Sequence, residues 1–217
     1  MSDSSPLKIH LTAVVDEGAV IGDGTAIWHF SHICVGAVIG ANCSLGQNVF
    51  VADNVSLGNN VKVQNNVAIY GGITVEDDVF LGPSCVLTNV TNPRSQVSRK
   101  SLYEKTLIKR GAMIVANATI VCGITLGRYC FIGAGAVVTK DIPDYGLVLG
   151  NPGKLSGYMS RHGHKLTFNE SGRATCPESK FVYEKVDDQV HCLDLNEDEP
   201  LPADLSIGSQ DYDSFKS

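Results

Sequence analysis

Aliphatic residues recur at every sixth position along most of the chain. One series starts at Ile9 and runs in steps of six to Leu87, and a second runs from Ile108 to Val138; every position in both is Ile, Leu or Val. An amphipathic helix would repeat at about 3.6 residues, and a two-sheet sandwich would place turn signals at about 8–12 residues. The period of six fits neither. It predicts short strands that wind into an all-β solenoid.

A second regularity marks the turns. Three places after each aliphatic residue of the first series, ten of the fourteen residues are Gly, Asn or Asp, the types that adopt a positive φ at least cost. The next position is usually small or β-branched, as in Ala37, Cys43 and Val49. We therefore predict three flat faces per coil with a turn at each corner. The two series hold 20 hexads, 14 and 6, which makes nearly seven coils.

The two series are out of phase, because residues 88–107 interrupt the repeat. This segment contains Pro93 and a cluster of basic residues, and an inserted loop of such length in a compact domain is usually either functional or disordered. A functional loop is favoured here, because a solenoid wall has no concave site of its own. We expect residues 9–142 to form the solenoid and to carry the functional site at this loop. Residues 143–195 are predicted to form a cap with a short helix near residues 154–162 and a hairpin within 165–193.

The last segment, 196–217, has six acidic residues and one basic residue mixed with Ser, Gly and Pro. This composition predicts a mobile acidic tail.

Composition limits the function. The 17 Lys and Arg against 23 Asp and Glu give a net charge of −6, with no basic run, which argues against nucleic acid as a partner. No stretch of 18 apolar residues occurs, so we expect no membrane insertion. The seven cysteines lack CxxC spacing. Together with the polar N-terminal sequence, they indicate reduced thiols and a cytoplasmic location.

The histidines do not predict a zinc enzyme. A catalytic zinc site of the three-histidine type would need three of them on the coils, but apart from terminal His10 only His29 and His32 lie there. Cys43, Cys85 and Cys130 fall at the small-residue position of their hexads, where packing explains them. Cysteines 176 and 192, with the neighbouring histidine, give only a weak metal signal. We expect no metal.

The hexads resemble the hexapeptide-repeat, left-handed parallel β-helix family, and residues 116–154 are similar to the coenzyme-A-binding end of its acetyltransferases. The resemblance implies an N-acetyltransferase that uses acetyl-CoA as its acetyl donor. It also implies a homotrimer in which the pantetheine arm lies in a groove between subunits. By position, the cofactor-binding residues would be Ala116, Gly133, Ala134, Lys140, Pro152 and Lys154.

Segments including IWHFSHICVGAVIG and TNVTNPR at 88–94 are similar to a narrower subgroup. Its members acetylate the 3-amino group of UDP-2-acetamido-3-amino-2,3-dideoxy-glucuronate for bacterial surface polysaccharides such as O-antigen. The segment 88–94 favours this UDP-linked uronic acid over the alternative, a dTDP-3-amino-3,6-dideoxyhexose. One departure is Gly71, where the subgroup commonly has an acidic residue. A solenoid that has lost activity and serves as a scaffold would carry the same repeat.

Residues 18 apart should stack one coil above another, about 4.8 Å apart. Stacking places Tyr70 beneath Thr88, at the root of the basic loop. Asn89 is the predicted catalytic residue, orienting the amine or a hydroxyl for direct attack on the thioester, and Arg94 is expected to bind the uronate carboxylate or the diphosphate. His29 or His32 are further candidates for a general base. The complete predicted substrate-binding set is Trp28, His29, Gln64, Asn65, Tyr70, Ser84 and Arg94.

Overall fold

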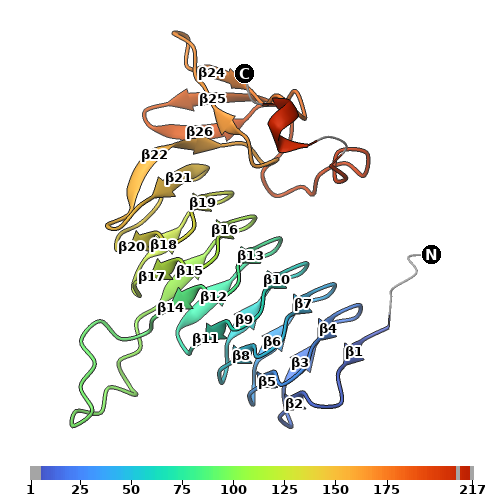
Figure 1. Cartoon of the computed structure of the whole chain (residues 1–217), viewed down its shortest axis with the longest axis vertical. Helices are drawn as coiled ribbons and strands as arrows, with labels where there is room; N and C mark the ends of the chain where they lie inside the picture. Colours follow the sequence, from blue (N-terminus) through green and yellow to red (C-terminus); the bar gives the residue numbers. More distant parts are fainter. Residues whose placement is uncertain (1–5, 209–210, 216–217) are drawn as a thin grey trace.

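The computed structural model describes residues 6–208 and 211–215 and contains a parallel β-solenoid with a β cap (Figure 1). The strands of each coil contribute in turn to three sheets, which we call faces A, B and C. Face B contains β2 (Val14–Val15), β5 (His32–Ile33), β8 (Phe50–Val51), β11 (Ala68–Ile69), β14 (Val86–Leu87), β17 (Thr119–Ile120) and β20 (Val137–Val138). Face C contains β3 (Val20–Ile21), β6 (Val38–Ile39), β9 (Ser56–Leu57), β12 (Ile73–Val75), β15 (Thr106–Ile108) and β18 (Thr125–Leu126).

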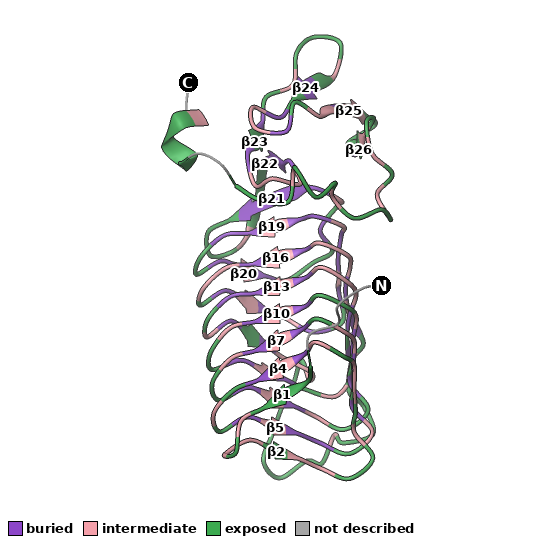
Figure 2. Cartoon of the chain, turned by 90° about the vertical axis from the view of Figure 1, so that its right-hand side faces the viewer, coloured by how far each residue is buried: buried purple, intermediate pink, exposed green. Residues whose placement is uncertain are grey.

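Face A is the longest sheet, and Figure 2 looks onto its strands as they follow one another up the stack. Its parallel strands are β1 (Lys8–Ile9), β4 (Ala26–Ile27), β7 (Ser44–Leu45), β10 (Lys62–Val63), β13 (Phe80–Leu81), β16 (Met113–Ile114), β19 (Phe131–Ile132) and β21 (Gly146–Leu149). The stack has the arrangement of a left-handed parallel β-helix, as the resemblance implied. Faces A, B and C have eight, seven and six parallel strands, because β21 adds a strand to face A after the 20 hexads end and thereby completes the seventh turn.

The hexad residues form the core as predicted. In almost every two-residue strand the second side chain points inward, so that Ile33, Leu45 and Leu81 are fully buried in one continuous cluster. Most of the residues three places later have positive φ, near 57° for Asn42 and Asn48. The small-residue position is also buried, and its cysteines are packing groups: burial raises the pKa of the Cys85 thiol to about 12.

The cap differs from its prediction in one element. Residues 154–159 form the strand β22 (Lys154–Met159), so the predicted helix is wrong. β22 runs antiparallel to β21 and covers an edge of face A that would otherwise have unpaired backbone groups. β23 (Lys165–Leu166) then pairs with β22. Within the described residues the one helical segment is the short η1 (Tyr212–Phe215), and no helix there is long and apolar enough to cross a membrane.

The predicted hairpin is present as β25 (Val182–Val186) and β26 (Gln189–Cys192), and β24 (Arg173–Thr175) extends it to a separate three-stranded sheet. This sheet packs through Tyr183 on Tyr145, which follows the last coil, with ring centroids 5.4 Å apart. The cap is therefore joined to the solenoid by an aromatic cluster as well as by the chain.

In the part that the structure describes, the acidic tail contacts the cap and the last coils. Asp198 forms an ion pair with Arg128 at 2.9 Å, and the Tyr129 hydroxyl donates to the Glu197 carbonyl at 2.7 Å. Arg161 donates to the Glu199 carbonyl at 2.6 Å. Composition did not predict these contacts, because it does not reveal which cations lie near the acidic residues; the mobility of the tail stays a prediction. Positions 209–210 and 216–217 of the tail lie outside the described residues.

Candidate functional site

The predicted site residues lie at two different corners of the solenoid. The AB corner comprises the turns that lead from face A to face B, and the BC corner those from face B to face C. Strand register stacks the residues of each corner in columns, as predicted. The AB corner holds Trp28, His29, Gln64, Asn65, Ser84, Ala116, Gly133 and Ala134, with Pro152 and Lys154 in the β21–β22 hairpin above them.

The BC corner holds Tyr70, Asn89 and Lys140, and Arg94 belongs to the loop that leaves it. Register confirms that Tyr70 lies one coil beneath Thr88. Lys140 is in the same column as Asn89 and thus apart from the other predicted cofactor residues. Face B separates the two corners. Ala134 and Lys140 lie at its opposite edges, and the six residue steps between them correspond to about 20 Å of extended strand. One chain alone therefore does not bring the two groups together.

The inserted loop 88–107 projects from the BC corner (Figure 1) and forms a cavity of about 610 Å³ against the solenoid wall. Its ends are joined, because the Glu104 backbone N–H donates to the Asn89 carbonyl at 3.0 Å. The Glu104 carboxylate accepts hydrogen bonds from both the hydroxyl and the N–H of Thr91, and these lower the pKa of that carboxyl. The cavity is lined by Tyr70, Val86, Leu87, Thr88, Asn89, Val90, Pro93, Arg94, Ser95, Val97, Arg99, Lys100 and Tyr103.

The polar groups of this cavity are available to a ligand. Within the described residues, the side-chain amide of Asn89 has no hydrogen-bond partner, and neither Arg94 nor Lys100 forms an ion pair. Arg99 uses its Nε to donate to the Asn92 carbonyl at 3.0 Å, which leaves its terminal nitrogens free of any hydrogen bond in the described part of the chain. Three cations beside an unpartnered amide suit an anionic, hydroxyl-rich ligand.

Tyr103 is a cavity residue that the sequence analysis missed. Its ring lies against Gly71, so that a Cβ built at position 71 would be 3.2 Å from Cδ2 of Tyr103. The glycine at position 71 therefore leaves room for the Tyr103 ring, which lines the cavity. No sequence signal indicated the contact, because Tyr103 belongs to the insertion, to which the six-residue register does not apply.

The AB corner has a smaller cavity of about 260 Å³ whose lining includes Trp28, His29, Gln64 and Asn65. Two of these residues also have structural roles. The His29 ring stacks on His10 with 3.5 Å between centroids, and the Asn65 Oδ1 accepts the Gln47 N–H at 2.8 Å. Gly133 packs closely, since a Cβ there would lie 2.4 Å from a Leu149 methyl carbon and would displace that exposed side chain.

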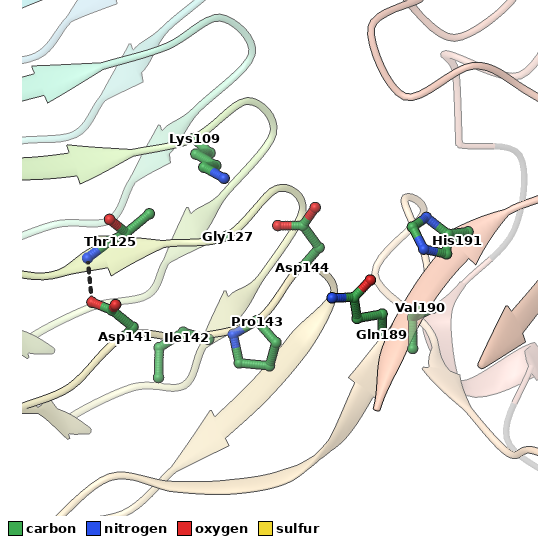
Figure 3. A pocket seen from close by; sticks show the side chains of 10 residues that line it. All are labelled: Lys109, Thr125, Gly127, Asp141, Ile142, Pro143, Asp144, Gln189, Val190 and His191. Atoms are coloured by element: carbon green, nitrogen blue, oxygen red, sulfur yellow. Dashed lines mark hydrogen bonds between the residues drawn. The ribbon is translucent and has the colours of Figure 1, made fainter. Parts of the chain in front are cut away.

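A third cavity, of about 340 Å³, lies between the last coils and the cap and contains no predicted site residue (Figure 3). Its carboxylates already have backbone partners: Asp141 accepts from the Thr125 N–H and Asp144 from the Arg128 N–H, each at 2.8 Å. Figure 3 shows that Gln189 and His191 reach it from the cap. We assign it no function, because both of its carboxylates already accept backbone N–H groups of the last coils.

One group in the described residues could hold a metal ion, although none was expected. Asp16, His32 and Cys34, at the first coils of the BC corner, have donor atoms that all lie within 4.8 Å of one another.

Comparison with known proteins agrees with the repeat. A family model described as bacterial transferase hexapeptide (six repeats) matches residues 18–53 and 54–89, and one described as hexapeptide repeat of succinyl-transferase matches residues 111–140. The dTDP-3-amino-3,6-dideoxy-alpha-D-galactopyranose 3-N-acetyltransferase of Aneurinibacillus thermoaerophilus is 44% identical over 81% of this chain and 90% of its own length.

Solved structures share the fold. A hexapeptide transferase family protein from Anaplasma phagocytophilum has a TM-score of 0.51 at 17% identity, covering 73% of this chain and 87% of that one. A hexapeptide-repeat acetyltransferase from Vibrio cholerae, solved with acetyl coenzyme A, has a TM-score of 0.50 at 23% identity over 58% and 72% of the two chains.

Proposed function

This chain belongs to the hexapeptide-repeat acetyltransferases, and from that premise we propose that it transfers an acetyl group from acetyl-CoA to the 3-amino group of a nucleotide-linked sugar. The observation that carries the proposal is the cavity beneath loop 88–107, which we call the BC cavity: within the described residues, its Asn89 amide has no hydrogen-bond partner and its Arg94 and Lys100 form no ion pair. The relative that is 44% identical, named for acetylation of a nucleotide-linked 3-amino sugar, supports the same chemistry. The seven free thiols fit the proposed cytoplasmic location.

The proposed reaction needs positioning more than a strong base. The neutral sugar amine attacks the thioester carbonyl carbon, and the tetrahedral intermediate collapses with cleavage of the carbon–sulfur bond. The amine nitrogen then loses a proton, which the departing coenzyme A thiolate takes up, so that the products are an amide and free coenzyme A. Asn89 would hold the amine or an adjacent hydroxyl in line with the carbonyl. No metal enters this sequence.

A homotrimer would complete the site. Tyr70, Asn89 and Arg94 belong to the BC corner, whereas the other five predicted sugar residues and most of the predicted acetyl-CoA residues are at the AB corner, across face B. A neighbouring copy could place its AB corner beside the BC corner of the first. The outward residues of face B support such contact, because most are apolar: Val14, Phe50, Ala68, Val86 and Val137. The corners of a single chain would then contribute to two different sites.

Two sugar nucleotides are candidates for the substrate. The 44% relative favours a dTDP-3-amino-3,6-dideoxyhexose. The unpaired Arg94 and Lys100 favour the UDP-linked uronic acid, whose carboxylate adds a negative charge for them. Coenzyme A release, measured with acetyl-CoA and each sugar nucleotide in parallel, separates them. Turnover of one substrate alone assigns the sugar. If neither is acetylated by folded protein that binds acetyl-CoA, the amino-sugar proposal is wrong.

Replacing Arg94 by Ala is expected to raise the KM for the sugar nucleotide about tenfold or more, with little change in the KM for acetyl-CoA. The reason is the loss of a charge-assisted contact, worth about 1.5–3 kcal/mol, to the diphosphate or carboxylate. Steady-state kinetics with each substrate varied in turn measure the effect. Arg173→Ala is the control, because Arg173 pairs with Glu184 on the cap. Equal losses for both substrates would contradict the assignment of Arg94 to the sugar.

A further inference from the structure

We propose that the first coils of the solenoid bind Zn²⁺ through Asp16, His32 and Cys34. These residues come from two successive coils. Asp16 follows β2, His32 and Cys34 flank the inward Ile33 of the next strand on face B, and register places Cys34 directly above Asp16. The site is at the edge of face B, three coils away from Asn89 and separate from the proposed acetyl-transfer chemistry.

The distances between the donor atoms are close to those of a tetrahedral zinc site. Both Asp16 carboxylate oxygens are 3.2 Å from His32 Nε2, and Cys34 Sγ is 3.9 Å from the same nitrogen. Ligands with the usual zinc bond lengths, arranged as a tetrahedron, are about 3.3–3.6 Å apart. Small movements of three side chains would therefore bring all of them to one ion.

The type of donor selects the metal. A thiolate, an imidazole nitrogen and a carboxylate oxygen form a mixed set that suits Zn²⁺, whereas Mg²⁺ and Ca²⁺ take oxygen ligands. Three protein ligands leave the fourth position of the tetrahedron to water, because Asp53, on the next coil, is not among the described residues whose donor atoms lie within 4.8 Å of one another. When zinc binds, the Cys34 thiol would release its proton to solvent and coordinate as thiolate.

The surrounding charge also favours a cation. In the described part of the chain, no Lys or Arg forms an ion pair with Asp16 or Asp53. Within the described residues, the ion-pair partner of Asp16 is His32. The Phe50 ring, edge-on to His32 at 5.8 Å, helps to fix the orientation of the imidazole.

A metal here would stabilise the weakest end of the stack. A terminal coil has a neighbour on one side only, and the first coil leaves Ile9 at 44% and Leu11 at 88% exposure. Ligands from the first coil and the second would hold these two coils together at the edge of face B. We therefore assign the ion a structural role at the N-terminal end of the solenoid.

The test starts with chelator-treated full-length protein, titrated with Co²⁺ and then with Zn²⁺. We expect one Co²⁺ per chain with the ultraviolet charge-transfer band of a cobalt–thiolate bond and the strong visible bands of tetrahedral cobalt, both abolished by Zn²⁺. Zinc should also raise the Tm, because it binds the folded state. Absence of the thiolate band from the wild-type protein would overturn the proposal without any variant.

Variants locate the site. Cys34→Ser, His32→Asn and Asp16→Asn are each expected to weaken zinc binding at least tenfold and to remove the zinc-dependent rise in Tm. The matched control is Cys192→Ser, which removes a half-buried thiol beside His191 in the cap and should leave binding unchanged. Loss of binding in Cys192→Ser, with binding retained in Cys34→Ser, would refute the proposed site. Asp16 is the informative position if a core variant fails to fold, because its side chain is on the surface.

Discussion

Replacing Asn89 by Ala is expected to lower kcat about a hundredfold while changing the KM of either substrate much less. The Asn89 backbone is fixed by the hydrogen bond from Glu104, and its side-chain amide lines the cavity without a partner in the described residues. An amide so positioned can orient the amine or stabilise charge that develops on the reacting atoms, and loss of one such donor typically costs about 10²–10³ in kcat.

Steady-state kinetics of coenzyme A release, with circular dichroism as a check of folding, measure the result. The control is Asn92→Ala, because Asn92 belongs to the same loop and is exposed; it should stay close to the wild-type rate. A large rise in the sugar KM with unchanged kcat would make Asn89 a binding residue instead of a catalytic one. Unchanged kcat and KM values in the variant would contradict the assignment of acetyl transfer to the BC cavity.

The periodic part of the fold could be predicted because one local rule repeats. Each hexad needs an inward aliphatic residue, a residue that accepts positive φ and a small residue, and sequence shows all three directly. Asn48 and Gly36 both have the expected positive φ. Register followed from the same rule, which is why the position of Tyr70 beneath Thr88 was confirmed. Even so, the period alone does not show that Lys140 and Ala134 lie at opposite edges of face B; that requires the assignment of each hexad to a face.

The parts outside the repeat could not be predicted as well, because their structure depends on tertiary contacts. Tyr103 lies against Gly71 across 32 positions of sequence, and no pattern in the loop relates the two. Residues 154–159 become a strand because β21 offers an unpaired edge. The acidic tail docks because Arg128 and Arg161 are placed to receive it. In each case the partner, rather than the segment, decides the conformation.

The contribution of an inward hexad residue to the free energy of unfolding can be measured by making the same substitution at two equivalent positions. Ile69 and Ile9 are both inward hexad residues, but Ile69 is fully buried in the middle of the stack and Ile9 is 44% exposed at its end. Ile69→Ala should lower the free energy of unfolding by about 2–5 kcal/mol, since it removes buried methyl groups and leaves a cavity between coils that cannot collapse. Ile9→Ala removes the same atoms from a partly hydrated site and should cost about 1 kcal/mol or less.

Urea unfolding at equal protein concentration, followed by circular dichroism, compares the two variants with the wild-type protein. Ile69→Val, which removes one methyl group, should give an intermediate loss of about 0.5–1.5 kcal/mol. Because each coil contacts only its neighbours, a weakened central coil can also separate the unfolding of the two ends of the stack, which would broaden the transition and lower its slope. Equal losses in the Ile69 and Ile9 variants would mean that the first coil is covered in the assembled protein, and that burial within one chain does not determine which coils are essential.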